Sequence, residues 1–203
     1  AEDSTKMAAA GATASAASPL SGNGMKADFG VFTFLIPDVE AELSGKPNLE
    51  KATGVVFRLQ SGNVVGNELR MTANVTRVLQ RYQTVIAIKN ELGTLPLETL
   101  TTTTAWKELK GVNNIYKITG LEARALEYEH ANRNQIRIAV NRSARRHRIN
   151  RRKTAEWEES VHNVRSVNQK PMVILLRSVI WRVYGTDTKG KAFFKQIRVD
   201  IPL

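Results

Sequence analysis

The 203-residue chain contains no cysteine. This absence excludes disulfide bonds, thiolate metal sites and a cysteine nucleophile. It fits a protein that never needs an oxidising compartment. We therefore expect the protein to be in a virion or inside a cell (cytoplasmic), and not to be secreted through a disulfide-forming route.

Long apolar runs are also missing. The longest strongly apolar stretch, 172–176, ends at Arg177, and about 20 apolar residues are needed to cross a bilayer as a helix. We therefore expect no membrane span. Residues 1–24 do not read as a secretory signal either, because acids stand at positions 2 and 3 and no apolar core follows.

Those first 24 residues have little that could form a core. Fifteen of them are Ala, Gly or Ser, so the segment is expected to be a flexible arm that orders only on a neighbouring subunit. Residues 25–203 are long enough for one domain, and 42% hydrophobic residues suffice for its core.

Catalytic patterns are absent. The sequence has no Walker A motif, no GxGxxG and only three histidines, so we expect no catalytic residues, no cofactor and no enzyme activity. Glu127–His130 and Glu159–His162 have the Glu-x-x-His spacing of di-iron bundles. Both flank a cationic segment that would repel a metal ion, so we interpret them as exposed helical pairs and expect no metal site.

Acids are missing from one segment in particular, residues 133–153. The whole chain carries a net charge of +11, and this segment holds nine cations and no acid, which leaves only +2 (11 minus 9) for the rest. The guanidinium group donates two hydrogen bonds to one phosphate in a fixed fork. We therefore predict a nucleic-acid-binding site made of Arg133, Arg137, Arg142, Arg145, Arg146, Arg148, Arg151, Arg152 and Lys153.

No base-reading motif accompanies these cations, so the contact is expected to be with backbone phosphates. Two other interpretations stay open: the cations could meet an acidic surface of a protein partner, or they could be a solvated helix face.

The fold expected from periodicity is α+β. Residues 29–36 and 54–60 are rich in β-branched and aromatic residues and predict N-terminal strands. Alternation over 172–184 and 192–201 predicts a C-terminal β-hairpin, 172–201. Apolar spacing predicts a helix over 67–92, and 93–114 reads as a Thr-rich connection. Leu121–Val167 has no internal Gly or Pro and predicts one long helix, or two broken near 141–143 or 150.

Together these elements predict a helical core with a long helix in the C-terminal half, possibly broken, beside a small antiparallel sheet made by the N-terminal strands and the C-terminal hairpin. The expected function is a non-enzymatic structural subunit of a large assembly: a viral coat, nucleocapsid or phage structural protein. Its partners would be copies of itself and nucleic acid. The alternatives are an RNA-bound subunit of a ribosomal or organellar ribonucleoprotein and a subunit of a secretion or tail apparatus.

Overall fold

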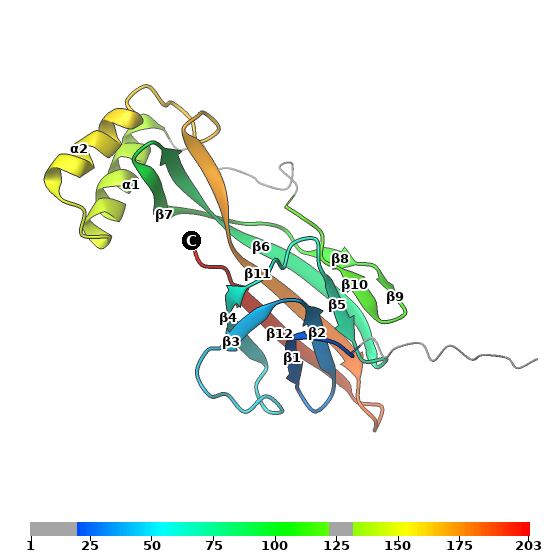
Figure 1. Cartoon of the computed structure of the whole chain (residues 1–203). Coiled ribbons are helices and arrows are strands. Elements are labelled where there is room, and N and C mark those ends of the chain that lie inside the picture. The colour runs from blue at the N-terminus through cyan, green and yellow to red at the C-terminus, as the bar shows by residue number, and fades with distance from the viewer. Residues whose placement is uncertain (1–19, 122–131) are drawn as a thin grey trace, which may run out of the picture.

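The computed structural model describes residues 20–121 and 132–203, and these residues are mostly β-structure (Figure 1). The strands are β1 (Gly24–Asp28), β2 (Thr33–Pro37), β3 (Glu40–Leu43), β4 (Gly54–Ser61), β5 (Glu68–Met71), β6 (Val75–Asn90), β7 (Gly93–Thr103), β8 (Lys107–Leu109), β9 (Gly111–Val112), β10 (Ile115–Lys117), β11 (Met172–Thr186) and β12 (Ala192–Asp200). The helices are α1 (Arg133–Arg146) and α2 (Arg151–Ser160).

The strands form two sheets. The five-stranded sheet has the order β1-β2-β5-β10-β9, and the seven-stranded sheet has the order β3-β4-β12-β11-β6-β7, with β8 also paired to β6. Neighbouring strands are antiparallel except for β12 and β4, which run parallel. The long strands β6 and β11 pair from Val75 to Ile88 and run along the length of the molecule (Figure 1).

The main hydrophobic core lies between the two sheets. The five-stranded sheet contributes Phe34, Ile36 and Met71, and the seven-stranded sheet contributes Val179 and Trp181. The ring of Phe34 on β2 meets the ring of Phe57 on β4 edge-on, with centroids 6.1 Å apart. Each sheet thus buries one apolar face against the other, which is the usual solution for a β-sandwich.

A second, smaller core lies under the two helices at the other end of β6 and β11. It joins Ile86 and Ile88 of β6 to Ile136 and Val140 of α1 and Trp157 of α2. On β6, Ile86 and Ile88 are an even number of residues away from Val78, which belongs to the main core, so all three side chains point to the same face of the sheet. The helices and the five-stranded sheet therefore cover the same face of the seven-stranded sheet, one after the other.

The predicted helical core with a small sheet is wrong. Of the two predicted N-terminal strands, 29–36 corresponds to β2, which lies in the five-stranded sheet. The other, 54–60, corresponds to β4 in the seven-stranded sheet, where it pairs in parallel with β12 of the C-terminal hairpin. Residues 67–92, predicted as a helix, form β5 and β6, and the predicted connection 93–114 contains β7, β8 and β9. The physical reason is tertiary: these residues pair with strands far away in the sequence.

The predicted long helix is also wrong. The described part of Leu121–Val167 contains two helices of 14 and 10 residues, separated at residues 147–150. Residues 1–19 of the predicted arm and the Glu127–His130 pair lie outside the described residues. Within the described ranges, no helix is both long enough and apolar enough to cross a membrane.

Candidate nucleic-acid interface

All nine predicted cations lie on one unit, formed by α1, the turn 147–150 and α2. We call this unit, residues 133–160, the helical hairpin. Five of the cations are on α1, Arg148 is in the turn, and Arg151, Arg152 and Lys153 begin α2. Every one of the nine side chains is exposed.

The first helix has one buried and one cationic face. Its N-cap is Asn132, whose side chain accepts from the backbone N–H of Gln135, and the Gln135 side chain accepts in return from the N-cap backbone N–H, which completes a capping box. Ile136, Val140 and Ala144 are buried at helical spacing. At 100° per residue, Arg142 and Arg145 fall on the opposite arc, and Arg137 lies at the border of the buried face.

The turn places three cations at the start of α2. Arg148 adopts a left-handed backbone with φ of 53°, and Asn150 caps α2 by accepting from the N–H of Lys153 at 2.8 Å. No acid stands in the first turn of either helix. A helix N-terminus is already electropositive, so Arg151, Arg152 and Lys153 add charge where an anion is most favoured.

Two acids engage the cations of the hairpin. Glu98 on β7, whose side chain is 16% exposed, lies 2.6 Å from the Nε of Arg146 and 3.5 Å from the Nε2 of His147. Glu156 lies 3.6 Å from the Nε of Arg152, and the two residues are one helical turn apart on the exposed face of α2. The first pair ties the hairpin to the sheet, and the second is worth little because Arg152 is 91% exposed.

Five cations have no such partner. Among residues 20–121 and 132–203, no acid or hydrogen-bond acceptor pairs with the side chains of Arg142, Arg145, Arg148, Arg151 and Lys153. They lie on the outer arc of α1, in the turn and at the start of α2. The five uncompensated charges therefore face solvent around one end of the hairpin.

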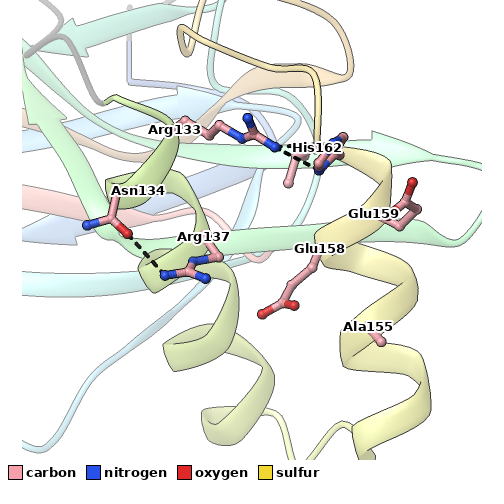
Figure 2. A pocket seen from close by; sticks show the side chains of 8 residues that line it. Arg133, Asn134, Arg137, Ala155, Glu158, Glu159 and His162 are labelled. Atoms are coloured by element: carbon pink, nitrogen blue, oxygen red, sulfur yellow. Dashed lines mark hydrogen bonds between the residues drawn. The ribbon is translucent and has the colours of Figure 1, made fainter.

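A cleft of about 620 Å³ separates the two helices at the other end of the hairpin. Figure 2 shows Arg133 and Arg137 entering it from α1, and Glu158 and His162 from α2 and the residues after it. The Nη2 of Arg133 lies 2.8 Å from the Nδ1 of His162, and Asn141 donates to Glu158. The two cations of the cleft thus have hydrogen-bond partners within it, His162 for Arg133 and Asn134 for Arg137, unlike the cations near the turn.

The hairpin is held to the body by buried side chains. Trp157 is the buried residue of α2, and it packs with Ile136 and Val140 in the second core. Ser143 on α1 accepts from the backbone N–H of Glu98 at 3.4 Å. The two helices cannot rotate without exposing this second core. The cationic surface of the hairpin is therefore held in a fixed orientation relative to the sheet.

The structure brings together all nine residues predicted from the sequence, although on two short helices instead of one long segment. Sequence analysis missed Glu98, which lies in a stretch predicted to be a connection. Its only sequence signal is that it interrupts the Leu and Thr residues of 95–104 with an acid. Glu159 and His162 lie near the cleft, but no cluster of three or more His, Asp or Glu residues that could hold a metal occurs in the described part of the chain.

No protein-family model, curated protein or solved structure matches this chain. The class of protein must therefore be argued from the hairpin and the sheets themselves.

Proposed function

We propose that the protein is a structural subunit of a large assembly, of the viral coat, nucleocapsid or phage structural type, and that its helical hairpin contacts the phosphates of nucleic acid. The observation that carries the proposal is the group of five exposed cations that have neither an acidic nor a hydrogen-bond partner among the described residues. Solvated helix faces usually interleave charges of both signs. Here the five cations form a contiguous positively charged surface that is available to bind a polyanion.

The chemistry of the surface favours backbone contact over base recognition. Arg and Lys bind phosphate through charge-assisted hydrogen bonds that are independent of sequence. α2 follows α1 through the turn 147–150, but both helices pack a buried face on the second core, and the exposed side chains they present near the turn are mainly cations suited to phosphate contact. Affinity should therefore depend steeply on salt and weakly on sequence.

The sheets support self-assembly. The described chain enters the fold through β1, an edge strand of the five-stranded sheet, and β3 is one edge of the seven-stranded sheet. An edge strand presents unpaired backbone donors and acceptors that a second chain can use. Residues 1–19 precede β1 in the sequence, so an arm exchanged between subunits would leave the fold at such an edge.

Purification of the full chain under low salt tests the proposal. We expect polymeric particles by electron microscopy and an absorbance ratio of 260 to 280 nm above that of protein alone. Deleting residues 1–19 should abolish polymerisation and preserve nucleic-acid binding. A monodisperse monomer free of nucleic acid would contradict the proposal.

A second variant separates the two parts of the proposal. Changing Arg142, Arg145, Arg148, Arg151 and Lys153 to Ala should preserve assembly and remove the nucleic acid. If assembly fails and nucleic acid is retained, the cations meet an acidic protein surface instead, as in a secretion or tail apparatus.

A further inference from the structure

The outer face of the seven-stranded sheet carries a second group of arginines. Register places Arg182 on β11 opposite Leu79 on β6, and Arg81 on β6 opposite Ile180 on β11. These residues alternate with Val78, Gln80, Tyr82 and Trp181, which face the main core. Arg81 and Arg182 therefore lie on the face that neither the five-stranded sheet nor the helical hairpin covers.

Both guanidinium groups lie over one indole. The Cζ of Arg81 is 4.4 Å from the ring centroid of Trp106, and the Cζ of Arg182 is 4.2 Å from the same centroid. Trp106 precedes β8, which pairs with β6. Both distances are well within the range for a cation–π contact, so the indole holds the two planar groups in place.

Two like charges thus share one aromatic ring without an acid between them. Glu108, in the same register row as Arg182, pairs with Arg77 at 3.3 Å, and Asp200 pairs with Arg198 at 2.8 Å. Burial lowers the pKa of the Arg81 guanidinium, and the charge of Arg182 lowers it further. A fixed pair of this kind is electrostatically unfavourable unless an anion joins it.

Most of the hydrogen-bonding capacity of the pair is also unused. The buried Nε of Arg81 has no hydrogen-bond partner among the described residues. Arg182 donates from Nε to the Oε1 of Gln196 at 3.3 Å, and the described ranges hold no partner for its two terminal nitrogens. Both side chains are partly exposed, so a small oxyanion can reach them from solvent.

We propose that Arg81, Arg182 and Trp106 form a binding site for a phosphate group. The two guanidinium groups donate to its oxygens and supply the positive charge, while the indole fixes their orientation. The phosphate belongs either to a polynucleotide backbone or to a free phosphorylated small molecule. This site does not rest on the proposed role of the hairpin, because the two lie on opposite faces of the seven-stranded sheet.

Calorimetric titration of the full chain with two probes, inorganic pyrophosphate and an eight-nucleotide oligothymidylate, tests the site. We expect Arg81→Gln and Arg182→Gln each to weaken pyrophosphate binding by about tenfold or more, as loss of a charged hydrogen bond implies. Arg182→Lys keeps the positive charge but loses the planar guanidinium fork. Its Kd for pyrophosphate should therefore lie between those of the wild type and Arg182→Gln. If the variants bind both probes more weakly, the phosphate belongs to a polynucleotide backbone. If they bind only pyrophosphate more weakly, it belongs to a free phosphorylated small molecule.

Two controls keep the test decisive. Arg77→Gln removes the same charge from the same strand and should change the Kd less than twofold, because Arg77 already pairs with Glu108. The variant with five hairpin cations changed to Ala should retain the pyrophosphate site. The proposal is overturned if Arg81→Gln and Arg182→Gln, both verified as folded by thermal melting, leave the Kd within twofold of wild type, or if the hairpin variant abolishes pyrophosphate binding.

Discussion

The Nε of Arg146 lies 2.6 Å from a carboxylate oxygen of Glu98, so the last turn of α1 is tied by charge to β7. This pair joins the surface proposed to bind nucleic acid to the sheet that supports it. It also withdraws one cation from that surface, which leads to the first prediction.

Glu98→Gln should have two opposite effects. The free energy of unfolding should fall by only about 0.5 kcal/mol, because Arg146 is 67% exposed and exposed pairs contribute little. Nucleic-acid affinity at low salt should rise, since the variant gains one uncompensated cation. Denaturant melts and filter binding measure the two effects, and Glu91→Gln, which removes an exposed acid in the turn between β6 and β7, is the matched control. An affinity that falls in Glu98→Gln would mean that the carboxylate orients the hairpin.

Trp157→Ala should detach α2 from the second core. Trp157 is 6% exposed in the second core, and truncating a buried Trp costs about 3 kcal/mol or more. Ile138→Ala, at a position on α1 that is 42% exposed, should change stability by less than about 0.5 kcal/mol. Hydrogen exchange should show faster exchange of 151–160 in Trp157→Ala and unchanged exchange in β12. Equal protection of α2 in both variants would disprove the anchoring role.

Lys195 is expected to hold the loop between β3 and β4. Its side chain is 7% exposed, and its Nζ donates to the backbone carbonyls of Leu49, Glu50 and Ala52 at 3.2, 2.8 and 2.5 Å. Lys195→Met leaves these carbonyls without their donor and should lower stability by about 1–3 kcal/mol. Limited proteolysis should then cut within 44–53 faster than in the control Lys191→Met, which changes an exposed lysine.

Alkaline pH should destabilise the fold through Tyr82. Burial raises the pKa of the Tyr82 hydroxyl to about 12, although a hydrogen bond from Gln80 opposes the shift. The unfolded chain ionises this group near its ordinary pKa of 10, so the unfolded state loses its proton first. Stability should therefore be insensitive to Tyr82 below pH 10 and fall between pH 10 and about 12.

Thermal melts across that range, compared with Tyr82→Phe, measure the contribution of Tyr82. The variant should show a shallower decline, with some slope left because burial also raises the pKa of Tyr116. Identical slopes for the two proteins would show that Tyr82 ionises equally in the folded and unfolded states.

The sequence misled most over 67–92, for two physical reasons. First, Gln80 is buried because it accepts from the Nε1 of Trp181 at 2.9 Å and donates to Thr119, so a polar residue occupies a core position and hides the alternation of a strand. Second, the register shift opposite Tyr184 and Gly185 leaves Thr76 as an extra residue. Val75 and Val78 then both face the core, three residues apart, which imitates helical spacing.

The nine cations could be found from the sequence because charge density needs no knowledge of the fold. Their arrangement could not: the break at 147–150 contains neither Gly nor Pro, and it depends on Arg148 adopting a positive φ. The Arg81–Trp106–Arg182 group was beyond sequence analysis, because its members come from three strand regions and meet only through the register of β6, β8 and β11. The alternation of 172–184 and 192–201 did predict the pairing of β11 with β12.

The salt dependence of nucleic-acid binding tests the central claim most directly. Binding of a 30-base-pair duplex is measured by fluorescence anisotropy at a series of salt concentrations. The wild type is compared with the variant in which Arg142, Arg145, Arg148, Arg151 and Lys153 are changed to Ala. A matched control changes Lys26, Lys46, Lys51, Lys117 and Lys189, which are exposed lysines outside the hairpin, to Ala.

If the five hairpin cations contact phosphates, the slope of log K against log salt should decrease in magnitude by about 4–5 in their variant, since each phosphate contact contributes about 0.9. The lysine control should change the slope by less than about 1. Equal slopes in the two variants would contradict the account, because the hairpin would then act only through the net charge of the protein.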